Sequence, residues 1–339
     1  MSFPLVGNPS DLFGSQERFW TSQNDRNKDT VETTGSNIYE TTKRAIVHVM
    51  GSFAGKILLY LRMIKFPHSV FALPFAFTGA IMAAGGIPTP GKIFWITLAM
   101  VGARSGAMGL NRIIDKKIDQ ANPRTKNREL PRGVIMVSEA ALFTIVSFAV
   151  FILSAYVLNP LCLKLSPVAI AVLFIYSYTK RFTWATHFVL GLALSAAPLG
   201  AWIAIRGTFD IEILPLAFAV IFWLAGFDTF YALQDIEFDK FYGLYSIPKR
   251  FGIRKSLLLA RTFHLMSFLL LLLSGLLFKL GIFYWLGMLI VAGMFIYEHS
   301  LVREDDLSRL DIAFFNMNGY ISITVFIFTF LDYILRHGT

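Results

Sequence analysis

Residues 213–234 read ILPLAFAVIFWLAGFDTFYALQ, and within this run only Asp228 carries a charge. An α-helix needs about 20 mostly apolar residues to cross the hydrocarbon core of a bilayer. The run has that length, and its apolar residues are continuous rather than alternating with polar ones. It therefore predicts a transmembrane helix with a carboxylate toward one end.

Eight further runs of this kind lie before and after it. The nine predicted spans cover about 67–86, 93–114, 138–158, 165–179, 186–206, 213–234, 256–279, 281–299 and 312–335. Continuous apolar runs exclude a barrel of the outer-membrane type, whose strands alternate apolar and polar residues. Of the 339 residues, 55% are hydrophobic and 16% are charged, whereas a soluble protein carries about a quarter charged residues. The sequence predicts an all-α, polytopic membrane protein with about nine transmembrane helices.

The positions of lysine and arginine predict the orientation, because short basic loops stay on the cytoplasmic side. With the N-terminus inside, the inner loops hold 17 of the 31 Lys and Arg residues, and the outer loops with the C-terminus hold five. We therefore expect an inner (cytoplasmic) membrane protein with its N-terminus and its active site on the cytoplasmic side. Membrane lipid is an expected partner, nucleic acid is not, and the oligomeric state stays open.

The N-terminal region differs in composition from the rest of the chain. Residues 1–56 are rich in Ser, Thr, Asn, Asp and Gly and predict a flexible cytoplasmic tail, followed by a membrane domain over 57–339. Within this region, residues 38–65 carry apolar and basic side chains together. They form either an amphipathic helix on the inner membrane face or an ordinary linker into the first span.

Two acidic clusters lie at the predicted cytoplasmic ends of spans. They are Asn111, Asp115 and Asp119 after the second span, and Asp228, Asp235 and Asp239 at the end of the sixth. On a continuous helix, spacings of i, i+4 and i+8, or of i, i+7 and i+11, place the side chains on one face. The spacing predicts two carboxylate stripes that reach the same membrane surface. Acidic residues of the last inner loop lack such a phase and are expected to be solvated: Glu298, Glu304, Asp305, Asp306 and Asp311.

The chemistry of these clusters favours a hard divalent cation. Neighbouring carboxylates repel each other unless a cation lies between them, and oxygen ligands without clustered His or Cys are typical of Mg²⁺. Basic residues near the clusters could meet the charge of a diphosphate held by that metal. The candidates are Lys116, Arg124, Arg128, Lys180 and Arg181. The alternative is that these residues are solvated loop charges at helix ends.

The motifs resemble those of the UbiA superfamily of intramembrane aromatic prenyltransferases. The pattern is Asn111-x-x-x-Asp115-x-x-x-Asp119, then Asn122-Pro-Arg-Thr with Arg128, and later Tyr231-x-x-x-Asp235-x-x-x-Asp239. The resemblance covers about residues 58–335. It implies a helical bundle around a central cavity with a cytoplasmic polar cap, and two Mg²⁺ ions that bridge a polyprenyl diphosphate to both motifs. The implied metal ligands are Asn111, Asp115, Asp119, Asp235 and Asp239. Arg112 is a departure, since many members have Asp there.

Two segments are similar to 4-hydroxybenzoate polyprenyltransferases in particular. They are Arg62-Met-Ile-Lys-Phe-Pro-His68 and the run Gly102–Asn111 with Arg104 inside it. An arginine within a span normally faces a polar cavity or an anionic partner. We hypothesise that Arg104, with Arg62 or His68, holds the carboxylate of an aromatic acid acceptor; a structural pairing of Arg104 is the alternative.

The resemblance implies a reaction by ionisation of the allylic diphosphate. An isoprenyl cation needs a dry pocket with aromatic faces. Candidates for that pocket are Phe71, Phe75, Tyr176, Tyr178, Phe227 and Tyr231. A carboxylate such as Asp228 is a candidate to assist deprotonation of the acceptor. The route is ubiquinone or menaquinone biosynthesis, with another carboxylated aromatic of a futalosine-type menaquinone route as an alternative acceptor. From another class, a membrane transporter would also explain many spans and an intramembrane arginine.

Overall fold

The computed structural model describes residues 53–66, 71–310 and 312–337. The predicted tail up to residue 52, most of the predicted interfacial helix, and His68 lie outside the described residues. The chain divides into two compact units, Met1–Tyr60 and Leu61–Thr339. The second unit contains all the predicted spans and both acidic clusters.

The described residues form helices and no strands, as predicted. The helices are α3 (Phe53–Met63), α4 (Leu73–Ala84), α5 (Pro90–Ile114), α6 (Lys116–Ala121), α7 (Val137–Leu158), α8 (Pro160–Thr179), α9 (Thr186–Arg206), α10 (Leu214–Ala232), α11 (Ile236–Tyr242), α12 (Ile247–Leu277), α13 (Ile282–Leu301) and α14 (Asn318–His337), with short turns η2 (Ile211–Ile213), η3 (Leu233–Asp235) and η4 (Ile312–Met317). Eight of the described segments are long and apolar enough to cross a membrane. The first predicted span is represented by the shorter apolar helix α4.

Local sequence explains where two of the spans begin. The fourth span begins at Pro160 rather than 165, because the Asn159 side chain accepts a hydrogen bond from the Cys162 backbone N–H. Helix α12 begins at Ile247, where Ser246 caps the Lys249 N–H in the same way, but its backbone is not helical at Gly252, at φ 76° and ψ 171°. The continuous helix of the seventh span therefore begins after Gly252, close to the predicted 256.

Small residues bring the membrane helices close together. A Cβ added at Gly102 would lie 2.8 Å from the Ser147 carbonyl oxygen, and one at Gly109 would lie 2.3 Å from the Thr144 hydroxyl. These positions fix α5 against α7. Gly191 of α9 approaches Ile221 of α10 in the same way, since an added Cβ would lie 2.7 Å from the Ile221 carbonyl oxygen. Close approach of these backbones holds the helices that carry the acidic clusters in fixed positions.

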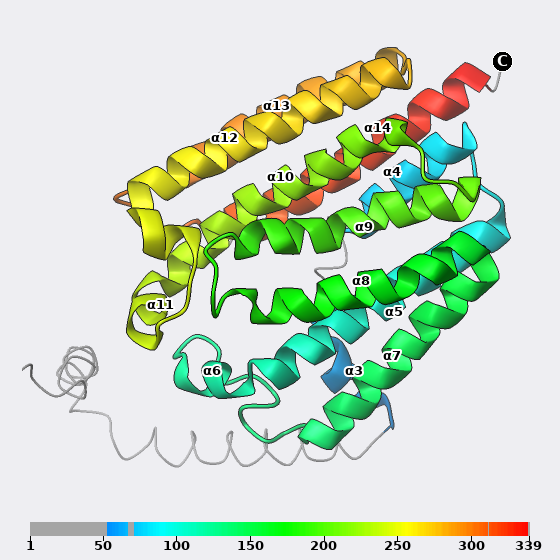
Figure 1. Ribbon diagram of the computed structural model, residues 1–339. Coiled ribbons are helices and arrows are strands. Elements are labelled where there is room, and N and C mark those ends of the chain that lie inside the picture. The colour runs from blue at the N-terminus through cyan, green and yellow to red at the C-terminus, as the bar shows by residue number, and fades with distance from the viewer. Residues whose placement is uncertain (1–52, 67–70, 311, 338–339) are drawn as a thin grey trace, which may run out of the picture. The chain divides into compact units, whose positions relative to one another are not determined.

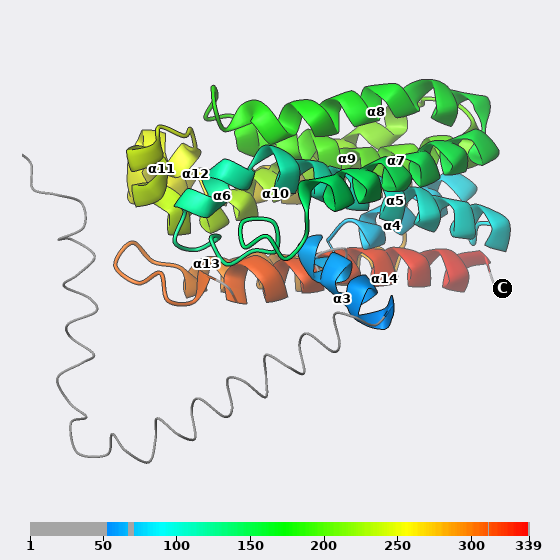
Figure 2. The ribbon, with the colours of Figure 1, turned by 90° about the horizontal axis from the view of Figure 1, so that it is seen from below.

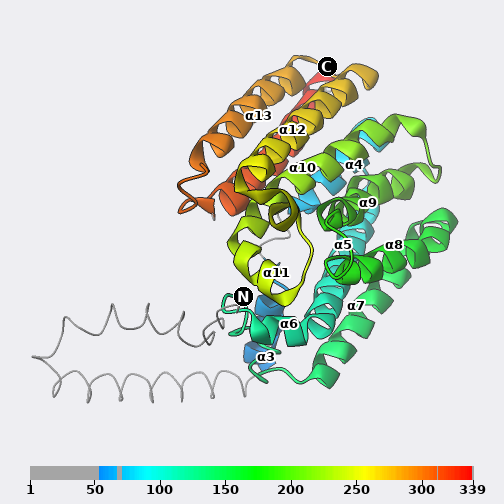
Figure 3. The same ribbon diagram turned by 60° about the vertical axis from the view of Figure 1, so that its left-hand side comes forward.

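The helices of the second unit run side by side, and the two short helices α6 and α11 lie next to each other at one end (Figure 1). The view from below shows the same pairing, with the C-terminal end of α14 at the opposite end (Figure 2). A third view again places α6 beside α11, below α10 (Figure 3). Because α6 contains the last residue of the first acidic cluster, Asp119, and α11 contains that of the second, Asp239, the fold brings both clusters to one end of the bundle.

Glu298 corrects one expectation about the last inner loop. Helix α13 continues to Leu301, so Glu298 faces the bundle and is completely buried. The Asn318 side-chain amide donates a hydrogen bond to its Oε1 at 2.8 Å. Glu304, Asp305 and Asp306 are exposed, as expected. Glu298 is buried because it lies on the inward face of α13, although the residues that follow it in the sequence are typical of a loop.

Candidate active site

A cavity of about 710 Å³ lies among α5, α8, α9 and α10 and reaches both acidic clusters. Most of its lining is apolar, and the charged residues concentrate where α5 and α10 end. It is lined by five carboxylates, Asp115, Asp119, Asp228, Asp235 and Asp239, and by six cations, Lys65, Arg104, Arg112, Arg124, Arg128 and Lys180. An apolar chamber with a charged end suits a ligand that has a hydrocarbon part and an anionic part.

Both acidic clusters lie where a long helix breaks, which differs from the continuous helices that the spacing predicted. Helix α5 ends at Ile114, Asp115 leaves helical geometry at φ −89° and ψ 2°, and α6 begins at Lys116. Helix α10 likewise gives way to η3, and Asp235 has φ −105° and ψ 6° before α11. The Asp119 N–H still donates to the Asp115 carbonyl at 2.8 Å, so the i, i+4 relation survives the break.

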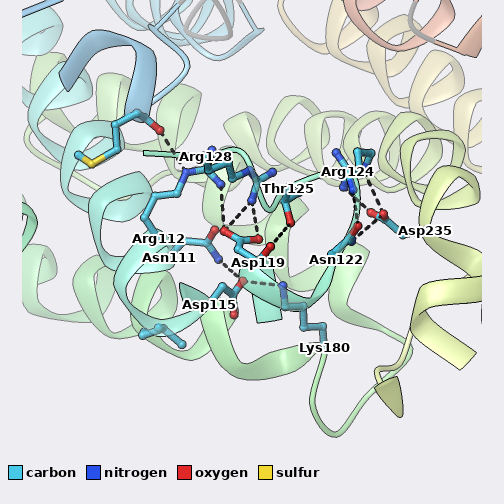
Figure 4. Close-up of polar contacts among 12 residues, drawn as sticks. Asn111, Arg112, Asp115, Asp119, Asn122, Arg124, Thr125, Arg128, Lys180 and Asp235 are labelled. Atoms are coloured by element: carbon cyan, nitrogen blue, oxygen red, sulfur yellow. Dashed lines mark hydrogen bonds and ion pairs between the residues drawn. The ribbon is translucent and has the colours of Figure 1, made fainter. Parts of the chain in front are cut away.

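Asp115 is held by two cations from the loop after α8. Its side chain is 2% exposed, with the Lys180 Nζ 2.5 Å from Oδ2 and an Arg181 Nη 2.8 Å from Oδ1. The Asn111 amide donates to Oδ2 at 3.1 Å (Figure 4). This arrangement fixes the carboxylate and keeps two cations at the edge of the cavity.

Asp119 is held by arginines of its own neighbourhood. Arg128 donates to both carboxylate oxygens, at 2.8 and 2.9 Å. Arg112 lies 3.9 Å from Oδ2 and donates through Nε to the Met63 carbonyl at 3.1 Å (Figure 4). Arg112, the departure from the family pattern, is therefore a buried cation that faces Asp119 rather than a metal ligand.

Arg124 joins the two acidic clusters. From the loop after α6 its Nε donates to Asp235 at 2.9 Å, and a second guanidinium nitrogen makes a short contact to the other carboxylate oxygen. Asn122 donates to the same carboxylate at 3.0 Å, and the guanidinium lies 4.8 Å from the centre of the Tyr231 ring. Burial opposes the charge of Arg124, but these bonds to Asp235 and the proximity of Tyr231 outweigh it and raise the pKa of the guanidinium.

The remaining two carboxylates have no lysine or arginine partner within the part of the chain that the structure describes. Asp239 accepts a hydrogen bond from the Ser246 hydroxyl at 2.7 Å. Asp228 pairs with His187, whose Nδ1 lies 2.7 Å from its Oδ2. The cavity therefore contains three carboxylates matched by cations and two that are held by neutral groups.

Some predicted site residues do not reach the cavity. Arg62 is exposed in the last turn of α3, and Lys116 lies just after the break at Asp115; neither lines the cavity. Arg181 does not line the cavity itself but donates to Asp115 and to the Ser177 carbonyl, which do. Phe75 packs against Trp223 with ring centres 4.9 Å apart, so it belongs to the core. Tyr178 is 37% exposed and lies under Arg181.

The other aromatic candidates do line it, together with aromatic residues that were not predicted, among them Phe314. The cavity is lined by Phe71, Tyr176, Phe227, Tyr231 and Phe314. Phe314, from η4, stacks on Tyr231 with ring centres 4.3 Å apart. Its position in the chain gave no signal, because it follows the sixth span by more than 70 residues and only the tertiary fold brings it there.

From the sequence, no role in the site was assigned to four of its polar residues: Lys65, Asn122, His187 and Ser246. Lys65 lies 5.9 Å from the centre of the Tyr231 ring, and burial lowers the pKa of its ammonium group while Tyr231 acts against this shift. Asn122 follows the first motif directly and could have been found from that position. A lone histidine or serine carries no such signal.

The donor chemistry of the site fits a hard divalent metal. The side chains of the two motifs offer amide and carboxylate oxygens only, all in one cavity, which are the ligands that Mg²⁺ prefers. Among the described residues, no three His, Cys, Asp or Glu side chains converge on one point. The reason is visible in the ion pairs, because Asp115 and Asp235 are turned toward Lys180, Arg181 and Arg124.

Residues 72–320 match the UbiA prenyltransferase family. The chain belongs to this family. It is 32% identical over 253 residues to a 4-hydroxybenzoate octaprenyltransferase from Vibrio atlanticus, covering 75% of this chain and 88% of the relative. A 4-hydroxybenzoate octaprenyltransferase from Saccharophagus degradans is 30% identical, with 76% and 85% covered. Membership of this prenyltransferase family indicates an enzyme rather than the membrane transporter considered as the alternative.

Two solved UbiA homologues have the same fold. The apo structure of a homologue from Aeropyrum pernix K1 has a TM-score of 0.72 and 30% identity, and covers 78% of this chain and 98% of its own. A homologue from Archaeoglobus fulgidus bound to GPP and Mg²⁺ has a TM-score of 0.63 and 21% identity, covering 81% and 99%. The UbiA prenyltransferase described here thus spans nearly the whole length of both homologues.

Proposed function

We propose that this UbiA prenyltransferase transfers a polyprenyl group from an isoprenoid diphosphate to the ring of 4-hydroxybenzoate, in a Mg²⁺-dependent step of ubiquinone or menaquinone biosynthesis. The observation that carries the proposal is the apolar cavity whose charged end joins both Asp motifs and six cations. The names of the curated relatives and the GPP and Mg²⁺ of the Archaeoglobus homologue support it.

Asn111, Asp115, Asp119, Asp235 and Asp239 are the residues that would hold Mg²⁺. Bound Mg²⁺ would supply charge neutralisation for the diphosphate leaving group. Lys180, Arg181, Arg124 and Arg128 each contact one of these carboxylates. The carboxylates therefore keep the cations near the position of the diphosphate, where they can donate to its oxygens.

The aromatic residues of the cavity supply the environment for the allylic carbon. Phe71, Phe227 and Phe314 contact one another, with ring centres 5.5 to 5.8 Å apart, and Tyr231 stacks on Phe314. Their π faces stabilise positive charge on the prenyl group, and their packing excludes water that would capture it.

Arg104 is the residue proposed to bind the acceptor carboxylate. It lines the cavity from the middle of α5 and donates to the Lys65 carbonyl at 3.5 Å, a long bond that still holds its orientation. A guanidinium in a membrane helix needs an anionic or polar partner, and a benzoate carboxylate supplies two oxygens for it.

The proposed orientation places the site on the cytoplasmic side of the inner membrane. The basic loops that follow α5 and α8, and the segment around α11, lie at the same end of the bundle, whereas the last turn of α14 lies at the other (Figure 1). This arrangement agrees with the excess of lysine and arginine in these loops.

A transfer assay tests the proposed function. Membranes containing the protein are incubated with labelled polyprenyl diphosphate, Mg²⁺ and 4-hydroxybenzoate, and lipophilic product is measured. We expect product in the wild type, none with EDTA, and none in Asp115→Ala or Asp235→Ala. Asp210→Asn is a control, since Asp210 accepts from Trp202 and Thr208 outside the cavity. Full activity of both alanine variants would refute the site, and product only with other carboxylated aromatics would refute the acceptor.

A further inference from the structure

A histidine and a carboxylate form a hydrogen-bonded pair inside the cavity, apart from the proposed metal ligands. His187 lies in the first turn of α9, is 2% exposed, and has its Nδ1 2.7 Å from Asp228 Oδ2. Asp228 belongs to α10, and its side chain keeps 21% of its surface accessible while it lines the cavity. The pair therefore presents one carboxylate to the cavity interior.

The hydrogen bonds of His187 fix where its proton lies. The Ile247 backbone N–H, in the first turn of α12, donates to His187 Nε2 at 3.2 Å. An Nε2 that accepts a hydrogen bond carries no proton, so the imidazole proton is on Nδ1 and is donated to Asp228. His187 is thus a neutral donor that orients the carboxylate and leaves its charge uncompensated.

Arg104 and Asp228 each lie about two helical turns before a motif residue, on α5 and on α10. Arg104 precedes Asn111 by seven residues, and Asp228 precedes Asp235 by seven. Two helical turns correspond to about 10 Å along each helix, so both residues lie deeper in the bundle than the motifs. The inner part of the cavity therefore has a cation on α5 and an anion on α10, which matches a ring with a carboxylate at one end and a hydroxyl at the other.

We propose that Asp228, positioned by His187, accepts the hydrogen bond of the acceptor's ring hydroxyl and takes its proton as the ring attacks the prenyl group. This inference rests on the proposed function and extends it to the general base. The phenol of a hydroxybenzoate, like that of tyrosine, is protonated at neutral pH, so a base in contact with it raises the electron density of the ring.

The step is balanced in atoms and electrons. A bond forms between the ring carbon ortho to the hydroxyl and the allylic carbon, and the allylic C–O bond breaks with its electron pair leaving on the diphosphate. The hydroxyl proton moves to Asp228, and its O–H electron pair forms the carbonyl of a cyclohexadienone. Loss of the ring proton at the new bond and reprotonation of the oxygen restore the phenol.

The test compares acceptors of different acidity in three proteins: wild type, Asp228→Asn and His187→Leu. The acceptors are 4-hydroxybenzoate and 3-fluoro-4-hydroxybenzoate, whose hydroxyl is more acidic and therefore needs less help from a base. With the unsubstituted acceptor, we expect kcat to fall about 10²-fold or more in Asp228→Asn, within the usual contribution of a general base. We expect a smaller loss in His187→Leu, and His187→Gln, which can still donate a hydrogen bond, should recover part of it.

The fluorinated acceptor separates a base from a structural residue. Both Asp228→Asn and His187→Leu should regain activity relative to wild type with 3-fluoro-4-hydroxybenzoate, while the KM for the prenyl diphosphate stays unchanged. Equal losses with both acceptors would overturn the inference, as would an Asp228→Asn variant with wild-type kcat. A wild type that does not prenylate the hydroxybenzoate would instead overturn the proposed function.

Discussion

The two Asp motifs have nearly the same spacing but different surroundings. Asp115 and Asp119 are 2% and 3% exposed, and each is paired with basic residues. In the second motif, Asp235 depends on Arg124 from the loop of the first motif, and Asp239 is held only by a serine hydroxyl among the described residues. Both carboxylates of the first motif are thus buried and paired with cations, whereas Asp235 of the second motif takes its cation from the loop that follows the first. The two motifs therefore offer the same kinds of ligand, but we expect substitutions in the first to reduce the stability of the fold more than substitutions in the second.

The largest expected effect is that of Asp115→Asn. This substitution replaces a proposed anionic metal ligand by a neutral amide and leaves Lys180 and Arg181 without their anionic partner. We expect kcat to fall about 10³-fold and the folded state to lose on the order of 2 kcal/mol, less than for a fully buried pair because both cations are partly exposed. Transfer assays and thermal unfolding in detergent measure the two effects.

The matched variant for this comparison is Asp239→Asn. It should lose activity with little change in the thermal midpoint, because no cation loses its partner and an asparagine can still accept from Ser246. Equal destabilisation by the two variants would contradict the difference between the motifs.

A second, smaller effect is expected for Arg124→Lys, which weakens the connection between the motifs and leaves the hydrogen bond from Asn122 to Asp235 in place. Lysine keeps the charge but cannot donate two parallel hydrogen bonds to Asp235 or stack on Tyr231. Because the hydrogen bonds lost between Arg124 and Asp235 join charged groups, we expect the KM for the prenyl diphosphate to rise about 10- to 100-fold. Steady-state kinetics with saturating acceptor measure it, and an unchanged KM would show that the second motif does not depend on the first.

Arg104→Met should affect one substrate only. Since Arg104 lies two turns from the first motif, we expect the KM for the hydroxybenzoate acceptor to rise about 10-fold or more from the loss of a charged hydrogen bond. The KM for the prenyl diphosphate should stay within about twofold of wild type. Equal increases for both substrates would instead indicate a structural role for Arg104.

The smallest expected effect is that of Ser246→Ala. The Ser246 hydroxyl orients Asp239 and accepts from the Lys249 N–H as the cap of α12. Loss of this cap predicts a destabilisation of about 1 kcal/mol and a decrease of a few-fold in kcat, measured as above. Ser246→Thr keeps the hydroxyl and should behave like wild type; a similar loss in both variants would mean that the hydroxyl is not responsible.

The sequence was sufficient for the fold and for the convergence of the two motifs on one cavity, whereas their role as metal ligands stays a prediction. Apolar length predicts the spans, and the phase of the Asp residues brings both clusters into one cavity even though the helices break at Asp115 and Asp235. The breaks themselves were not predictable, because the residues around them have ordinary helical propensities.

What the sequence could not provide are the pairings that depend on tertiary contacts. Nothing in the linear order places Arg124 on Asp235, His187 on Asp228, or Phe314 on Tyr231, since each pair is separated by 41 or more residues. The same limit explains Lys116, which lies inside the first motif in sequence but does not line the cavity. Proximity in the chain is a weak guide when helices present only one face to a site.

The central claim is that both motifs together bind one prenyl diphosphate through Mg²⁺. A prenyl thiolodiphosphate, in which sulfur replaces the allylic oxygen, resists ionisation of its allylic bond and binds without turnover. Thermal unfolding of the purified protein with this analogue, in the presence and in the absence of Mg²⁺, tests the claim. We predict a rise in Tm of roughly 5 °C at saturation only when the analogue and Mg²⁺ are both present, and its loss in Asp115→Asn and in Asp235→Asn alike. A rise that needs no Mg²⁺, or that survives in either variant, would contradict the account.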